Sequence, residues 1–205
     1  MAFFLAFRGT FAQVVELIRS FLVHWKVKYS KVDAYGHWLI LGWGDKTIFL
    51  LEELLSAIQR EEDQQRWCPP RRRIVVLAER PVRDMQAEVR LHFRSQDPGG
   101  QGVYRRMRRA VLYREGCKAH RAELMKVNAF AAEHILIMCG AETDTSSDHE
   151  AIRTLLALGA LPQPLRAEQG TDVWAEMHQR ENARVVNTIL DAAQGIVARH
   201  AAPRP

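Results

Sequence analysis

Short runs of apolar residues alternate with longer amphipathic segments from Gly36 onward. The runs are rich in Ile, Val and Leu and are bounded by Gly, Pro or charged residues, as is typical of strands buried on both faces. The segments between them repeat apolar residues every three or four positions, as in helices that cover a sheet. This alternation predicts an α/β fold: a Rossmann-like parallel sheet of about five to six strands with helices on both faces.

The predicted elements follow one another in a regular order. Strands are expected at residues 37–41, 74–78, 110–113, 134–139 and 172–176. Helices are expected at residues 47–59, 82–93, 118–130, 149–158 and 182–198, with polar loops at 60–73, 96–101 and 141–148. We therefore assign a Rossmann domain to residues 36–200 and a frayed tail to residues 201–205.

Residues 1–35 form a separate N-terminal helix and linker in this prediction. Charged residues interrupt the apolar stretch at 1–23, so it lacks the run of about 20 apolar residues that spans a membrane. Its apolar residues recur at helical spacing, namely Val14, Val15, Ile18, Leu22 and Val23. We expect an amphipathic helix that lies on a membrane or a partner, or that packs on its own domain.

The net charge of +5 permits contact with phosphate, anionic lipid or acidic partners without choosing among them. Many of the basic residues surround the third predicted strand: Arg105, Arg106, Arg108, Arg109, Arg114, Lys118, Arg121 and Lys126. Only Tyr104 and Tyr113 are available there to stack on bases. A solvated face or a patch facing anionic lipid is therefore favoured over a nucleic-acid site.

The cysteines, Cys68, Cys117 and Cys139, are odd in number and have no CxxC spacing. This argues against a zinc knuckle or a disulfide framework and favours a reducing compartment. Cys139 is expected to be a buried structural thiol rather than a nucleophile. The histidines form no HxxxH or HExxH pair, and His37 and His134, which begin strands, are expected to pack or to bond locally.

The turn after the first predicted strand is the main candidate for a ligand site, because ligands of parallel sheets collect at the carboxyl ends of strands. Gly42 and Gly44 match the first two glycines of a GxGxxG phosphate-binding loop. Thr47 stands at the third position, and Asp45 places negative charge where a phosphate would lie. The two glycines either let a phosphate approach the backbone or simply permit a tight turn.

Carboxylates at the ends of the predicted strands offer a second kind of site. Glu79, which ends the second strand, either binds a ribose hydroxyl or pairs with Arg80. Several acidic residues are expected at the same edge of the sheet: Asp45, Glu79, Asp144, Asp148 and Glu176. Such a group either is solvated or binds a hard cation such as Ca²⁺, for which Asp45 and Glu176 are the preferred pair.

Several of these segments resemble the CASTOR/POLLUX family of ion channels. The resemblance lies in GHWLILGWGDK at residues 36–46, IVVLAER at 74–80, the Arg114-x-Gly116 turn and VWAEM at 173–177. It extends in the correct order over about residues 36–190. Gly44 departs from the family pattern, which usually has serine at that position.

The resemblance implies a regulatory domain of the RCK type, which forms a ring beneath a tetrameric pore. Its ligand would be Ca²⁺ or a nucleotide, and the implied binding residues are Gly42, Gly44, Asp45, Lys46, Glu79 and Arg114. Residues 1–35 resemble the end of a pore-lining helix and its linker, while the pore itself has no counterpart, so we expect no conduction by this chain alone.

The same resemblance implies partners and a location. We expect a homo-oligomer or an assembly with channel subunits, attached to a membrane through the N-terminal helix or the pore subunit. The domain would face a reducing compartment such as the cytoplasm or the nucleoplasm. Nucleic acid is not an expected partner.

Two other functions fit parts of the sequence. An NAD(P)-dependent oxidoreductase fits the fold and the GxG turn, but no catalytic acid and base set and no Tyr-x-x-x-Lys pair is present, so we expect no enzyme. A basic nucleic-acid-binding module would rest on the arginine-rich stretch alone.

Overall fold

The computed structural model describes residues 30–64, 73–96, 101–140, 145–161, 171–192 and 196–197. Six parallel strands form one sheet in the order β3-β2-β1-β4-β5-β6. They are β1 (His37–Leu41), β2 (Ile74–Ala78), β3 (Val111–Glu115), β4 (Ala132–Ile137), β5 (Thr171–Ala175) and β6 (Ile196–Val197). The predicted α/β fold is confirmed. The strand order reverses between β1 and β4, where a Rossmann sheet opens a crevice for ligands.

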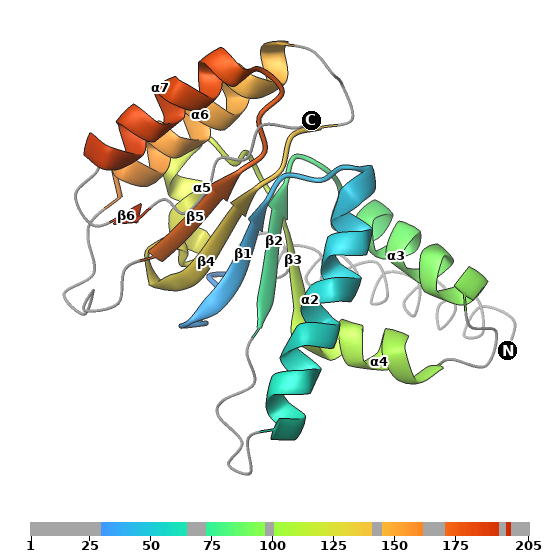
Figure 1. Ribbon diagram of the computed structural model, residues 1–205. Coiled ribbons are helices and arrows are strands. Elements are labelled where there is room, and N and C mark those ends of the chain that lie inside the picture. The colour runs from blue at the N-terminus through green and yellow to red at the C-terminus, as the bar shows by residue number, and fades with distance from the viewer. Residues whose placement is uncertain are drawn as a thin grey trace, which may run out of the picture. The chain divides into compact units, whose positions relative to one another are not determined.

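Helices cover both faces of this sheet (Figure 1). On one face lie α2 (Asp45–Gln64), α3 (Val82–Gln96) and α4 (Gln101–Ala110). On the other lie α5 (Arg121–Lys126), α6 (Thr145–Gly159) and α7 (Arg180–Ala192), with a short 3₁₀ turn, η1 (Ala129–Ala131), before β4. Because side chains alternate along a strand, β1 contributes to both layers.

The core accordingly has two halves, one on each face of the sheet. Leu39 and Leu41 pack with the helices α5, α6 and α7, whereas Ile40 packs with α2, α3 and α4. All three side chains are 0% exposed, as expected for a central strand of a parallel sheet. The buried centre of the sheet sets the positions from which the loops at its carboxyl edge begin.

The chain divides into two compact units, Met1–Lys31 and Val32–Pro205. The whole sheet belongs to the second unit, as do Val32 and Ala34, which are buried in its core. The amphipathic helix predicted in residues 1–35 falls on residues 1–29, outside the described part of the chain. The tail at residues 201–205 also lies outside it, and the assignment of a domain to residues 36–200 stays a prediction.

Several predicted boundaries are wrong. The loop expected at 60–73 is helical as far as Gln64, and the helix expected at 182–198 ends at Ala192 and is followed by β6. The sequence pattern missed α4 because arginines dominate it and only one apolar stripe, with Tyr104 and Met107, faces the sheet. The helix α2 begins at Asp45 rather than at residue 47, since an acidic side chain suits the first turn of a helix.

Candidate ligand site

The turn that leaves β1 requires a glycine at position 42. Gly42 has φ +114°, a conformation that side chains rarely adopt, and a Cβ there would lie 2.5 Å from the backbone oxygen of Met138. Its N–H donates to the Leu77 oxygen at 2.8 Å. Gly42 therefore lets the loop after β1 lie directly on the segment after β4, which is a structural role that needs no ligand.

The beginning of α2 is partly closed to a phosphate. The N–H of Gly44 donates to the Thr47 hydroxyl at 2.9 Å, and the N–H of Thr47 donates back to the Gly44 oxygen at 2.9 Å. Thr47, at the third position of the GxGxxG pattern, is fully buried, and Asp45 is exposed in the first turn. A pyrophosphate at this helix end would thus lose one amide donor and face a carboxylate.

A cavity of about 270 Å³ opens beside this turn. Its lining comes from the loops after β1, β2, β3 and β4 and from α6, namely Gly42, Trp43, Ala78, Glu79, Arg80, Lys118, Gly140 and Glu150. The cavity is slightly smaller than the roughly 300–1,000 Å³ of most small-molecule pockets. Of the six residues predicted for cofactor binding, it brings together Gly42 and Glu79; Gly44, Asp45, Lys46 and Arg114 do not line it.

Lys118 places a buried cation in this cavity, and the sequence analysis missed it. Its side chain is 8% exposed, and Nζ lies 3.0 Å from a Glu150 carboxylate oxygen and donates to the Met138 oxygen at 3.1 Å. The sequence showed Lys118 as one of many basic residues near β3. Its place two residues after the Gly116 turn was the one signal that could have set it apart.

Trp43 and Arg80 are held at the rim of the cavity by one carboxylate. Glu88 on α3 accepts the Trp43 indole N–H at 2.9 Å and also pairs with Arg80. Arg80 therefore has a partner other than Glu79. Glu79 itself interacts with Cys117, whose pKa is raised chiefly by burial and further by a hydrogen bond with that carboxylate.

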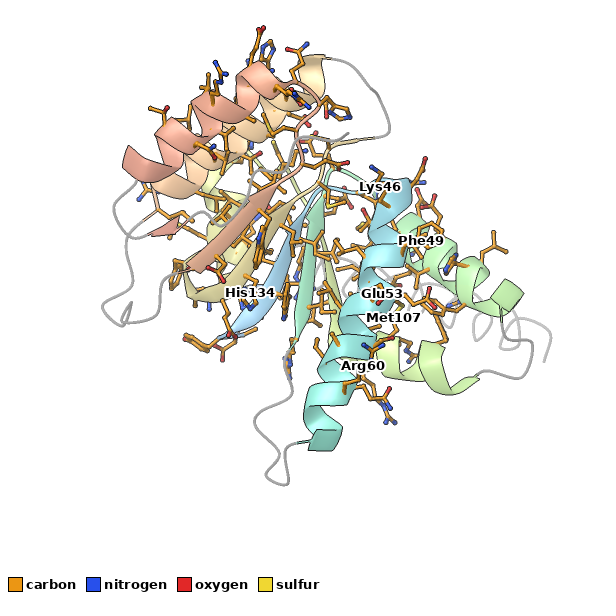
Figure 2. The ribbon with its side chains drawn as sticks, viewed as in Figure 1. Lys46, Phe49, Glu53, Arg60, Met107 and His134 are labelled. Carbon is orange, nitrogen blue, oxygen red and sulfur yellow. The ribbon has the colours of Figure 1, made fainter. Side chains whose placement is uncertain are left out.

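Arg114 and Lys46, two predicted binding residues that do not line the cavity, have partners within the protein. Arg114 on β3 donates to the Tyr113 oxygen at 2.9 Å, and burial lowers the pKa of its guanidinium. Lys46 stands in the first turn of α2, at the edge of the sheet where the strands end (Figure 2). Its Nζ lies 3.0 Å from a carboxylate oxygen of Glu176, just beyond β5.

Glu176 thus forms an ion pair with a lysine of the same chain. Its second carboxylate oxygen accepts the N–H of Cys139 at 3.2 Å. A Ca²⁺ ion bound between Asp45 and Glu176 would have to displace the Lys46 ammonium group. The role of this pair in metal binding stays a prediction, and Asp144 lies outside the described residues.

Asp148 belongs to α6 rather than to the predicted loop at 141–148, and it is 0% exposed. Its carboxylate accepts the N–H groups of His178 at 2.8 Å and Gln179 at 3.0 Å and the side-chain amide of Asn182 at 2.9 Å. Burial alone would raise its pKa, but these hydrogen bonds outweigh burial and lower it. Asp148 therefore caps the beginning of α7 from a neighbouring helix.

Sequence comparison relates the chain to plant ion channels, although no protein-family model matches it. It is 28% identical over 185 residues to the Oryza sativa subsp. japonica protein named Probable ion channel POLLUX, which covers 90% of this chain. It is 29% identical to the ion channel DMI1 of Medicago truncatula and 28% identical to the ion channel CASTOR of Lotus japonicus, over 78% and 82% of this chain.

The chain is similar in sequence to the CASTOR and POLLUX ion channels. The similarity predicted from the glycine turn, the VLAER strand and the later segments is thereby confirmed. The matched region spans only 17% of the POLLUX and 17% of the CASTOR protein, so the chain corresponds to a small part of these channels.

A solved enzyme structure shares the fold. Glucose-6-phosphate 1-dehydrogenase from Mycobacterium avium superposes with a TM-score of 0.55 at 14% identity, over 80% of this chain and 36% of that one. The RCK domain of GsuK superposes with a TM-score of 0.45 at 17% identity, over 81% of this chain and 26% of that one. Among the described residues, no helix combines the length and the apolar character that crossing a membrane requires.

Proposed function

We propose that the chain is a regulatory, ligand-sensing domain of a CASTOR/POLLUX-like cation channel. The observation that carries the proposal is the sequence similarity to these channels over 78–90% of the chain, combined with a cavity at the carboxyl edge of the sheet. The domain would bind a small effector at this edge and pass the change to pore subunits. Its task in this scheme is binding rather than catalysis.

The lining of the cavity favours a nucleotide as the effector. Trp43 offers an aromatic wall and Glu79 an acceptor for ribose hydroxyls. Lys118 is a buried cation for a phosphate, which would have to replace the Glu150 carboxylate as its partner. The amide lost to Thr47 and the charge of Asp45 disfavour a pyrophosphate at the start of α2. A mononucleotide therefore suits the site better than a dinucleotide, and Ca²⁺ at Asp45 and Glu176 is the competing effector.

Calorimetric titration of the chain with AMP, NADH and Ca²⁺, each separately, tests the effector. AMP is expected to bind, and Glu79→Gln is expected to weaken its binding about tenfold, the loss expected when a charged hydrogen-bond acceptor becomes neutral. Glu53→Gln, an exposed position along α2 and away from the rim (Figure 2), is the matched control and should leave binding unchanged. Heat from none of the three would reject the sensing role.

Assembly with channel subunits needs a separate experiment. Large apolar side chains are exposed on the helices of both layers, with Phe49 58% and Leu91 72% exposed on one and Leu156 54% and Val185 48% exposed on the other. Burial in a homo-oligomer or against channel subunits, at a membrane, would cover them. Co-expression with a CASTOR or POLLUX subunit should give co-purification and an effector-dependent current, and Leu91→Ser should weaken the association. Failure to co-purify would contradict the channel role without affecting effector binding.

A further inference from the structure

Three residues with different metal-binding atoms converge beyond the ends of β4 and β5. Cys139 follows β4, Asp148 lies in the first turns of α6, and His178 lies between β5 and α7. One ligand atom from each, a thiol sulfur, a carboxylate oxygen and a ring nitrogen, lies within 4.8 Å of the other two. None of these three residues lines the cavity described above.

We propose that Cys139, Asp148 and His178 bind a Zn²⁺ ion. Zinc is bound tetrahedrally by sulfur at about 2.3 Å and by nitrogen or oxygen at about 2.0–2.2 Å, which places neighbouring ligand atoms about 3.3–3.8 Å apart. The Asp148 oxygen and the His178 Nδ1 already lie 3.3 Å apart. The Cys139 sulfur lies within 4.8 Å of both atoms, so on binding it would approach them, release its hydrogen bond to the Glu176 backbone oxygen, and the imidazole ring would turn.

The set of donors selects the class of metal. Ca²⁺ and Mg²⁺ take oxygen ligands, whereas a mixed sulfur, nitrogen and oxygen set suits Zn²⁺ and its neighbours in the transition series. On binding, the Cys139 thiol forms a bond to the ion and releases its proton to water. The thiolate and the Asp148 carboxylate then balance the two positive charges of zinc, so the buried site is neutral.

The surroundings hold the ligands in place before any metal arrives. The Asp148 carboxylate is fixed by the N–H groups of His178 and Gln179 and by Asn182, a role typical of the outer shell of metal sites. The side chain of His178 is 15% exposed, whereas that of Asp148 is 0% exposed, so the ion would enter from the His178 side. Three protein ligands leave the fourth position of the ion to water.

The test uses Co²⁺ and Zn²⁺ with the full chain in a background carrying Cys68→Ser and Cys117→Ser. The chain has three cysteines, so Cys139 is then its sole thiol. Metal-free protein titrated with Co²⁺ is expected to develop a sulfur-to-cobalt charge-transfer band and the strong visible absorption of tetrahedral cobalt. Zn²⁺ should abolish both signals at one equivalent, and excess Ca²⁺ should not.

Two variants in that background assign the ligands. Cys139→Ser should abolish the charge-transfer band, and His178→Gln should lower the Zn²⁺ affinity by about 100-fold, since even outer-shell partners are worth about 10- to 100-fold. Far-ultraviolet circular dichroism checks that each variant folds. If Cys139→Ser unfolds, His178→Gln still tests the site, because it replaces a side chain that is only half-buried. No charge-transfer band in the background protein, or an unchanged affinity in His178→Gln, would overturn the site.

Discussion

His37, at the beginning of β1, makes the stability of the domain depend on pH in a predictable window. Its side chain is 0% exposed, and neither ring nitrogen makes a hydrogen bond of good geometry to a described residue. Burial lowers its pKa from 6.5 to about 4. The nearby backbone groups of Val127 and Ala34 raise the pKa and so offset part of this effect, although their geometry is poor. The ring is therefore neutral in the folded protein above about pH 4.

The sign and the size follow from linkage. Below about pH 6.5 His37 is protonated in the unfolded chain, but in the folded chain it stays neutral until the pH nears 4. The free energy of unfolding therefore falls as the pH drops from about 6.5, and it stops falling near pH 4. Each pKa unit corresponds to about 1.4 kcal/mol, so the free energy of unfolding should fall by about 2 kcal/mol between about pH 7 and about pH 5 from this residue alone.

Urea unfolding, followed by tryptophan fluorescence at several pH values, measures this effect. Other groups titrate in the same range, so the useful quantity is the difference between the wild type and His37→Leu, which keeps an apolar side chain in the same space. The variant is expected to lose about 2 kcal/mol less than the wild type on acidification. His149→Gln, at an exposed position of α6, is the matched control and should follow the wild type. Parallel curves for the wild type and His37→Leu would show that the ring is not held neutral by burial.

Further predictions concern the rim of the sheet. Gly42→Ala should destabilise the fold by at least about 3 kcal/mol in urea, because its Cβ would collide with the Met138 backbone oxygen; a loss below about 1 kcal/mol would contradict that contact. Asp45→Asn combined with Glu176→Gln should abolish any Ca²⁺ heat in calorimetry, and an unchanged titration would dispose of that metal pair. Asp148→Ala should cost about 2–4 kcal/mol and speed amide exchange in the first turn of α7; unaltered exchange would refute its capping role.

Local sequence pattern was enough to predict most strands and the class of fold. The run at 37–41 is observed as β1 and the run at 74–78 as β2, because a strand buried on both faces must be apolar throughout. The glycine turn was also visible, since a strained backbone position leaves few residue choices. Helix ends were predicted less well: the polar end of α2 and the basic α4 carry little apolar periodicity.

The similarity to ion channels could likewise be recognised from short segments, because they preserve both residue type and order along the chain. The resemblance implied Lys46 as a binding residue, whereas Glu176 was a candidate metal ligand because it ends a predicted strand. Their mutual ion pair, across 130 positions of the chain, was not visible in either segment. Pairing of this kind decides whether a carboxylate is available to a metal.

Two features were decided by the tertiary structure alone. Lys118 forms an ion pair with Glu150 and a hydrogen bond to the Met138 oxygen inside a cavity. Cys139 lies close to Asp148 and His178 beyond the strand ends. These partners come from loops that follow different strands and from the helix α6, and they have no spacing that a motif could record. Sequence periodicity shows which face of an element is buried. The distance between two side chains from different elements depends instead on the order of the strands. The crossover from β3 to β4 sets that order, and it does so only when the whole sheet has formed.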